Sequence, residues 1–474
     1  MRCNKLVLPV TILLASCTVL FTAEQESSKP AKRYVITNYG AVTEPNIINT
    51  KAIQDAIDKC AADGGGTVVI PTGTFITGAV FFKQGVNLEI EADGVLKGTT
   101  NMADYKLIQT RWEGEERMWV SALVNVFDVN GFRMTGKGII DGSGDIFRTS
   151  VSGRGAFGGG FGGFRGTRGV QSDSVNNVGP VRKGPPSLGP EGGLHPAPDS
   201  PAYEMHEVDL PTYARPRLIA IQNCNDVVVE NLKFKNQASW CLFVLYSKKV
   251  EIRNLVIRAE HTIPSSDGID IDSCDGVHII GVDIDVNDDC IAIKSGKDED
   301  GRRVNRPVEN VLVEKSIFRY GHGGVSMGSE MSGGIRNIEI RDSVMEEDNW
   351  APIRFKSQPS RGGVVENITY RNIELKNTRK AFEFNMAWRM VNPKPPSDPL
   401  PVVRNVKIIN VSGTTDNVGD MYGLPDSPIT NVTFENCNIK AQRGFTLENV
   451  ENLDLSGLKI EVQQGEPIIH RNAQ

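Results

Sequence analysis

Four short segments of this chain carry side chains that could do acid-base chemistry. In chain order they contain Asp267, then Asp288 and Asp289, then His322, then Arg354 and Lys356. Carboxylates crowded into one cleft repel one another, so at least one of the three should keep its proton near neutral pH and serve as an acid, while another stays ionised as a base. An acid and a base that flank one bond are the groups that glycoside hydrolysis needs.

The basic residues suit an anionic sugar. The formal net charge of −6 and the pI near 5.7 give the chain no general attraction for a polyanion, so we expect no nucleic-acid partner. Local cations would have to hold an acidic polysaccharide, and an arginine guanidinium can bind a uronate carboxylate through two hydrogen bonds. We therefore predict that Arg354, Lys356 and Lys294 bind the substrate beside His322.

Each motif alone also has an ordinary explanation. Asp-rich segments such as residues 267–272 and 283–285 could be solvent-facing turns or calcium ligands. No pair of cysteines has zinc-finger spacing and the six histidines are isolated from one another, so a structural zinc is not expected. With an acid and a base both supplied by carboxylates, we expect no metal cofactor.

The four segments recur at intervals that match a repeat in the sequence. Asp288 follows Asp267 by 21 residues, His322 follows Asp288 by 34, and Arg354 follows His322 by 32. A short pattern of Asn, Asp, Gly or Lys followed by alternating apolar residues begins at positions 226, 249, 276, 310, 337, 367, 405, 431 and 452. Self-similar strands at this period indicate a solenoid.

The alternation of apolar and polar residues is typical of strands with one buried face. Strands joined by bends make a coil, and stacked coils satisfy their backbone groups by parallel pairing at about 4.8 Å. The sequence therefore predicts an all-β fold, a single-stranded parallel β-helix. In such a fold Asp267, Asp288 or Asp289, His322 and Arg354 would stand in one column.

The first 23 residues have the layout of a secretory signal. Arg2 and Lys5 precede an apolar stretch from Leu6 to Ala15, which predicts an exported protein. The sequence Leu-Ala-Ser-Cys at 14–17 also matches a bacterial lipoprotein box, which would leave Cys17 acylated and the protein anchored in the outer membrane. Ordinary cleavage would leave it periplasmic or extracellular.

Residues 24–474 are expected to form one β-helix domain. An amphipathic helix beginning near Asn49 and ending at Gly64 should cap the first coil, because an open end exposes core and strand edge. Between about residues 149 and 214 the pattern gives way to Gly- and Pro-rich sequence, which predicts a long insertion from one coil. Beyond the signal segment six cysteines are scattered, and we expect most of them to be small buried apolar residues.

The four segments resemble the signature motifs of the polygalacturonases, glycoside hydrolase family 28. The matching stretches are Ser-Ser-Asp-Gly-Ile-Asp at 265–270, Asn-Asp-Asp-Cys-Ile-Ala-Ile-Lys-Ser-Gly at 287–296, Gly-His-Gly-Gly-Val-Ser-Met-Gly-Ser-Glu at 321–330 and Arg-Phe-Lys at 354–356. The likeness also includes residues 34–75, 138–144 and 215–217 and the late coils. It therefore covers most of the mature chain.

The resemblance implies a right-handed β-helix and inverting hydrolysis without a metal. It makes Asp288 the general acid, lets Asp267 and Asp289 position and deprotonate the water, and places His322 near the acid. Inverting enzymes separate acid and base by roughly 6.5 to 9.5 Å, a distance that we expect between carboxylates one coil apart. The partner would be a pectic polysaccharide or oligogalacturonide, and the enzyme would act as a monomer.

Some residues depart from the commonest family pattern. Ser265 and Ser266 replace Asn-Thr, Asn287 replaces Gly, and Phe355 replaces Ile. The ionisable groups are kept, so the departures bear on the substrate, and rhamnogalacturonan or xylogalacturonan could replace polygalacturonate. A calcium-dependent pectate lyase or a non-catalytic β-helix adhesin would share the solenoid, and the sequence does not decide between internal and chain-end cleavage.

Overall fold

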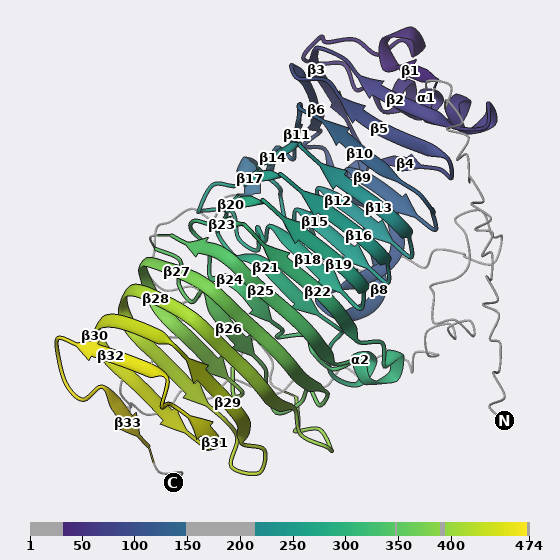
Figure 1. Cartoon of the computed structure of the whole chain (residues 1–474). Helices are drawn as coiled ribbons and strands as arrows, with labels where there is room; N and C mark the ends of the chain where they lie inside the picture. Colours follow the sequence, from purple (N-terminus) through teal and green to yellow (C-terminus); the bar gives the residue numbers. More distant parts are fainter. Residues whose placement is uncertain (1–31, 148–213, 347, 389–393, 472–474) are drawn as a thin grey trace, which may run out of the picture.

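The computed structural model describes residues 32–147, 214–346, 348–388 and 394–471. In these residues each strand, apart from the two of an antiparallel hairpin at 107–120, pairs in parallel with the strand at the same place in the next coil. The chain thus winds as a right-handed parallel β-helix around one long apolar core (Figure 1). The predicted all-β solenoid is confirmed.

The coils build three parallel sheets. The first sheet contains β1 Arg33–Val35, β2 Gly66–Ile70, β5 Val86–Ile90, β10 Arg133–Gly136, β13 Asn225–Glu230, β16 Lys248–Arg253, β19 Asp275–Ile280, β22 Val308–Glu314, β25 Ile335–Met345, β27 Val364–Asn385, β28 Val402–Tyr422, β29 Ile429–Glu435 and β31 Val450–Asp454. The second contains β3 Gly73–Thr77, β6 Gly94–Gly98, β11 Ile139–Asp141, β14 Lys233–Lys235, β17 Val256–Arg258, β20 Asp283–Asp285, β23 Ile317–Phe318, β30 Cys437–Glu448 and β32 Leu458–Val462. The third contains β4 Val80–Phe82, β9 Val124–Phe127, β12 Ile219–Gln222, β15 Leu242–Leu245, β18 Ile269–Asp272, β21 Asp289–Lys294, β24 Gly323–Met327, β26 Ile353–Lys356 and β33 Ile468–His470. The long strands β25, β27, β28 and β30 bend from one sheet into the next.

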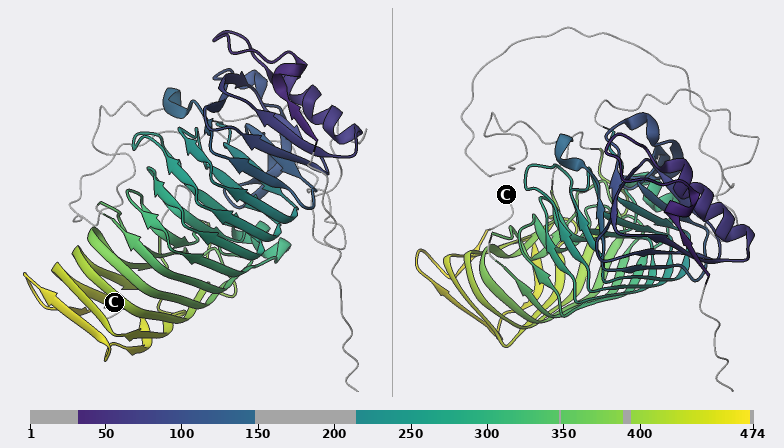
Figure 2. Two further views of the ribbon diagram at one scale, coloured as in Figure 1. Left: turned by 45° about the horizontal axis from the view of Figure 1, so that its top comes forward. Right: turned by 90° about the horizontal axis from the view of Figure 1, so that it is seen from above.

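Helix α1, Thr50–Ala62, covers the amino-terminal end of the solenoid (Figure 2). Its buried face contains Ile53, Ala56 and Ile57, which pack into the core of the first coils. The predicted capping helix is therefore confirmed. The remaining elements are α2 Asp298–Val304, the 3-10 helices η1 Ile36–Tyr39, η2 Met102–Asp104 and η3 Gly144–Phe147, and an antiparallel hairpin of β7 Leu107–Trp112 and β8 Glu115–Val120.

The residues that begin each repeat lie at a backbone corner of the first sheet. All nine have a positive φ, between 50° and 72°: Asp226, Lys249, Gly276, Asn310, Asn337, Asn367, Asn405, Asn431 and Asn452. Asn, Asp and Gly reach this left-handed conformation more easily than other residues, which explains why they mark the repeat. The amide of Asn367 also donates to Asn337 (3.2 Å), and that of Asn405 donates to Asn367 (3.3 Å), so side-chain hydrogen bonds follow the axis.

The six cysteines of the described residues are free and buried, as predicted for small apolar residues in the turns. No helix among the described residues is long and apolar enough to cross a membrane. The signal segment at 1–23 with Cys17, and nearly all of the insertion at about 149–214, lie outside the described residues.

Candidate active site

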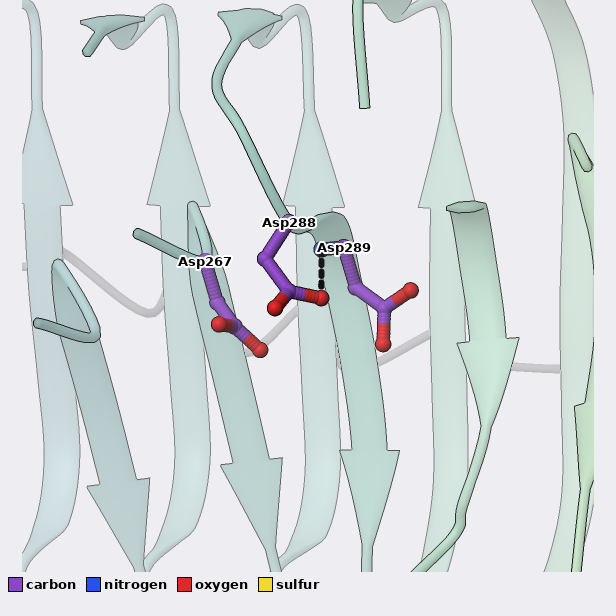
Figure 3. A group of neighbouring side chains, drawn as sticks. All are labelled: Asp267, Asp288 and Asp289. Carbon is purple, nitrogen blue, oxygen red and sulfur yellow. Dashed lines mark hydrogen bonds between the residues drawn. The ribbon is translucent and has the colours of Figure 1, made fainter. Parts of the chain in front are cut away.

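Asp267, Asp288 and Asp289 come together at the edge of the third sheet where its strands begin (Figure 3). Asp267 lies two residues before β18, Asp288 directly precedes β21, and Asp289 is the first residue of β21. The amide of Gly268 donates to the carbonyl of Asp289 (3.0 Å), which places the two segments in adjacent coils. The predicted gathering of the three carboxylates is confirmed.

The carboxylates are closer together than we expected. Each offers one oxygen that lies within 4.8 Å of an oxygen of the other two, so the predicted separation of roughly 6.5 to 9.5 Å is wrong. The physical reason is that Asp267 and Asp289 lie at matching positions of adjacent coils, because β18 pairs with β21 from Ile269 and Ile291 onward and neighbouring strands are about 4.8 Å apart.

The predicted column is correct for His322 and wrong for Arg354. The amide of His322 donates to the carbonyl of Asp288 (3.0 Å), so these two residues are adjacent. Arg354 instead pairs in register with Ser326, four residues beyond His322. Its long side chain makes up the difference, because Nη1 donates to the carbonyl of His322 (3.2 Å).

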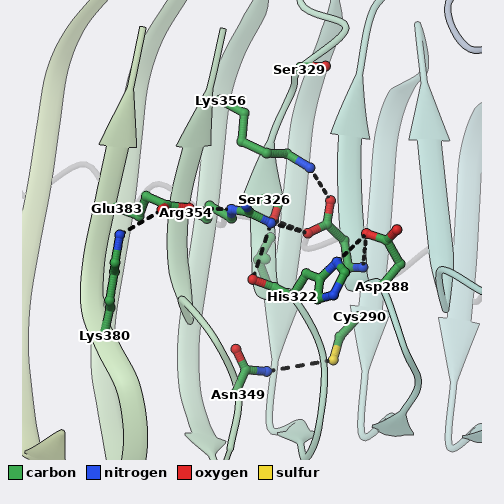
Figure 4. A network of polar contacts seen from close by, with 12 residues as sticks. Asp288, Cys290, His322, Ser326, Ser329, Asn349, Arg354, Lys356, Lys380 and Glu383 are labelled. Carbon is green, nitrogen blue, oxygen red and sulfur yellow. Dashed lines mark hydrogen bonds and ion pairs between the residues drawn. The ribbon is translucent and has the colours of Figure 1, made fainter. Parts of the chain in front are cut away.

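Asp289 is held ionised by two basic partners, Lys356 and Arg354, whose side chains are labelled in Figure 4. Lys356 Nζ donates to Oδ2 (2.5 Å), Ser326 Oγ donates to Oδ1 (2.8 Å), and Arg354 Nη1 donates to Oδ1 (3.3 Å). Burial alone would raise the pKa of Asp289, but the charges of Lys356 and Arg354 hold that pKa well below its usual range. Asp289 is thus ionised at neutral pH, and both of its oxygens accept hydrogen bonds.

Asp288 and His322 form a second ion pair, with 3.4 Å between His322 Nδ1 and Asp288 Oδ1. Burial opposes both charges, but each group stabilises the other, so the pKa of Asp288 is lowered and the pKa of His322 is raised. Below the raised pKa of His322 the pair holds one proton. The side chains are also accessible, with exposed fractions of 40% for His322 and 27% for Asp288.

Asp267 has the opposite environment. Its side chain is buried, its Oδ1 has no hydrogen-bond partner among the described residues, and Asp270 and Asp288 lie nearby. Burial, with the negative charges of Asp270 and Asp288, raises the pKa of Asp267 well above its usual range. This matches the expectation that one carboxyl of the three keeps its proton near neutral pH, but in the free protein that carboxyl is Asp267 and not Asp288.

The His322–Asp288 pair leads to a prediction about pH. The alkaline limb of kcat/KM should lie above pH 6.5, because the pair loses its proton only as pH rises through the raised pKa of His322. Substituting His322→Gln leaves the proton on a carboxyl group alone, whose ordinary pKa is about 3.9, so the limb should move to lower pH. A kcat/KM profile of both proteins tests this, and an unchanged alkaline limb in the variant would assign it to another group.

The basic residues predicted to bind substrate already have carboxylate partners. Arg354 Nε donates to Glu383 Oε2 (2.6 Å), and Lys356 is committed to Asp289, with the Trp388 ring 5.3 Å from its Nζ. Substrate binding by these residues stays a prediction.

Lys294, at the other end of β21 from Asp289, is buried as well. Its Nζ is 3.4 Å from an oxygen of both Asp270 and Glu330 and 4.3 Å from the ring of Trp240. Asp270 and Glu330 were not singled out from the sequence, although both lie inside the motifs. Glu383 was also missed, and its distance of 29 residues from Arg354 is a coil interval that could have indicated it.

The hairpin β7–β8 covers the third sheet on one side of the carboxylates. One outward-facing row of this sheet runs in register through Ala220, Phe243, Asp270, Ala292, Ser326 and Arg354. Phe243 has an exposed fraction of 0% and Ala220 of 1%, because Trp112 of the hairpin stacks on Trp240 (5.0 Å between rings) and Arg217 fills the space above Phe243.

Ion pairs fix this hairpin to the coils. Arg111 Nη1 lies 2.6 Å from Asp272 Oδ1, and Glu116 Oε2 lies 2.7 Å from Arg303. Gly114 at its tip packs so tightly that an added Cβ would lie 2.5 Å from the Cβ of Lys297. The row is therefore covered at β12 and β15, the two coils that precede Asp267.

Comparison with known proteins identifies the family. The protein-family model described as glycosyl hydrolases family 28 matches residues 203–458. The exo-poly-alpha-D-galacturonosidase of Dickeya chrysanthemi is 27% identical over 355 residues, which cover 73% of this chain and 55% of that protein, so the chain spans little more than half the length of this relative.

Two solved structures share the fold. A hyperthermoactive exopolygalacturonase from Thermotoga maritima superposes with a TM-score of 0.72 at 26% identity, over 90% of this chain and 92% of that one. A family 28 exopolygalacturonase of Yersinia enterocolitica has a TM-score of 0.73 at 20% identity, over 94% of this chain and 78% of that one, and shows the fold alone. The family model matches more than half of the residues of this chain, and the Thermotoga structure agrees with it. The chain therefore belongs to glycosyl hydrolase family 28 and is a glycoside hydrolase.

Proposed function

We propose that this enzyme hydrolyses α-1,4-galacturonosidic bonds of a pectic polymer or oligogalacturonide, by inverting acid-base catalysis, from a chain end. One observation carries the chemistry: an ionised carboxylate, Asp289, lies within 4.8 Å of Asp288, and Asp288 shares a proton with His322. A base and a proton donor thus face the same small volume, as hydrolysis requires.

In the proposed reaction, the proton of the His322–Asp288 pair moves through Asp288 to the glycosidic oxygen as the bond from this oxygen to the anomeric carbon breaks. Asp289 takes a proton from a water whose oxygen attacks the opposite face of that carbon, and Asp267 orients this water. The products are two shorter sugars, and the site recovers its first state when Asp289 returns its proton to the pair through solvent. Atoms and charge balance without a metal or another reactant.

Inversion is proposed although the carboxylates are close. A retaining enzyme needs a free carboxylate nucleophile. Both oxygens of Asp289 are engaged by Lys356, Ser326 and Arg354, and a protonated Asp267 is a poor nucleophile. Attack by water is therefore favoured over a covalent glycosyl intermediate.

Chain-end cleavage is supported by the hairpin β7–β8. Because it covers the outward row over β12 and β15, a polymer lying along the third sheet could extend freely only toward the later coils. The Dickeya and Thermotoga relatives are also named as exo-acting enzymes. We propose that a terminal sugar binds between Asp267 and the hairpin.

A single product analysis tests the proposal. With polygalacturonate as substrate and EDTA present, we expect the shortest product to dominate from the first time points, no unsaturated uronate absorbing in the ultraviolet, and β-configured product in early NMR spectra. Oligomers of mixed length would show internal cleavage. Ultraviolet absorbance restored by calcium would indicate a pectate lyase, α-configured product a retaining enzyme, and no cleavage of any pectic substrate an adhesin.

The same product analysis addresses the substrate. Ser265, Ser266, Asn287 and Phe355 differ from the commonest motif, and Ser266 is buried beside Asp267 with its Oγ 3.2 Å from the amide of Asn287. Faster release from rhamnogalacturonan or xylogalacturonan than from polygalacturonate would move the assignment to one of these polymers.

We further propose that residues 1–23 direct export, either to the periplasm or cell exterior or, through Cys17, to the outer membrane. Fractionation of cells that carry Cys17→Ser should release an anchored protein and leave a soluble one unchanged. A monomer in solution is also proposed, and light scattering would test it.

A further inference from the structure

Arg354 begins a chain of alternating charges that leads away from the catalytic carboxylates (Figure 4). Its Nε donates to Glu383 Oε2 (2.6 Å), and Lys380 Nζ donates to Glu383 Oε1 (2.8 Å). Lys380 Nζ also donates to Asp420 Oδ1 (3.0 Å). Together with Asp289, this is a sequence of anion, cation, anion, cation and anion that spans five coils, from β21 through β24, β26 and β27 to β28.

The coil register builds this chain of charges. Arg354 pairs with Glu383, and Glu383 pairs with Asp420, at one position of three successive coils of the third sheet. Glu383 and Arg354 have exposed fractions of only 6% and 7%, so water screens their interaction weakly. Burial would raise the pKa of Glu383, but Arg354 and Lys380 lower it to about 2, so Glu383 is ionised at neutral pH.

Of the two contacts that Arg354 makes with carboxylates, the contact with Glu383 is the stronger. The contact with Asp289 is 3.3 Å long, whereas the contact with Glu383 is 2.6 Å. A guanidinium is planar, so holding Nε from one side and Nη1 from the other fixes the orientation of the group. Without Glu383, only the longer contact and the carbonyl of His322 would hold Arg354.

We propose that Glu383 is a positioning residue for the hydrolytic reaction: it holds Arg354 in the orientation in which Arg354 keeps Asp289 in place beside Asp288. Among the described residues, Glu383 forms its ion pairs with Arg354 and Lys380 and has none with Asp288 or Asp289. Lys380, three residues earlier on β27, supports Glu383 directly, and Asp420 of the next coil holds Lys380. This inference rests on the proposed function of the site.

The test is a double-mutant cycle on kcat and KM for the pectic substrate. Glu383→Gln keeps the size of the side chain and removes its charge, and it should lower kcat by about tenfold to a hundredfold with a much smaller change in KM, because a small misplacement of a catalytic group has an effect of this order. In an Arg354→Ala background the same substitution should change kcat by less than about twofold, since residues that act through one another are not additive.

The matched control is Glu374→Gln, on the same strand β27. Glu374 also faces a lysine, Lys376 at 3.7 Å, but its side chain is 58% exposed and lies on another sheet, so the control should keep wild-type kcat. Equal losses from Glu383→Gln in both backgrounds, or no loss in either, would overturn the inference.

A second variant covers the case in which Glu383→Gln does not fold. Glu383→Asp keeps the charge but is one methylene too short for the 2.6 Å contact, and it should also lower kcat. A folded aspartate variant with wild-type kcat would overturn the inference too. If wild type and Glu374→Gln both fail to cleave every pectic substrate, the proposed function fails instead, which separates the two outcomes.

Discussion

Replacing Asp288 by asparagine is expected to lower kcat by about 10² to 10⁴-fold, the usual contribution of a general acid or base. The amide has the same shape, and its oxygen can still accept the hydrogen bond that the Asp289 amide donates to Asp288 Oδ1 (2.9 Å). It cannot pass a proton to the glycosidic oxygen. Folding should be nearly unaffected, because the side chain is partly exposed and the amide has the same shape.

Steady-state kinetics together with binding of a short oligogalacturonide measure this loss. Asp275→Asn serves as the control, since Asp275 lies on the first sheet and accepts from Asn310 in an Asn ladder. The asparagine at 288 should also release His322 from its partner, so the pKa of His322 should fall. A variant that keeps more than about a tenth of the wild-type kcat would remove Asp288 from the role of acid.

Replacing Arg354 by alanine should lower both activity and stability. The substitution leaves Asp289 and Glu383 as buried carboxylates that have lost a positive partner, and removing one side of a buried ion pair typically destabilises a protein by about 3 to 5 kcal/mol. Activity should fall as well, because Asp289 loses part of the charge that keeps it ionised and in place. Denaturant unfolding and kcat measure the two effects separately.

The loss of stability caused by Arg354→Ala should depend on pH. Glu383 has a folded pKa of about 2 against an ordinary value of 4.5, so its ionisation stabilises the fold above pH 4.5, and that contribution is lost as pH falls toward 2. The stability gap between wild type and Arg354→Ala should therefore be widest above pH 4.5 and should narrow in acid. A gap that stays constant from pH 7 to pH 3 would show that lost packing, and not lost charge, causes the destabilisation.

Much of the fold could be predicted from the sequence because it follows from local rules. Eight of the nine repeats begin with Asn, Asp or Gly, and one with Lys249, because the backbone has a left-handed conformation at each of these positions. Alternation within each strand fixes which side chains face the core, and the face of Ile53, Ala56 and Ile57 predicts the capping helix. The intervals between Asp267, Asp288 and His322 match the length of a coil, and this was enough to predict that the three residues lie close together.

The tertiary structure alone decided how the charges pair. The sequence indicates that Arg354 and Lys294 lie on strands, but not which groups their long side chains reach. It therefore did not show that Glu383 holds Arg354. Nor did it show that Asp270 and Glu330 lie beside Lys294. Likewise, no local pattern indicates that the hairpin of residues 107–120 lies over coils more than a hundred residues later. Such contacts depend on side-chain packing between coils. The same packing gives three chemically identical residues different pKa values, because the pKa of Asp267 is raised while those of Asp288 and Asp289 are lowered.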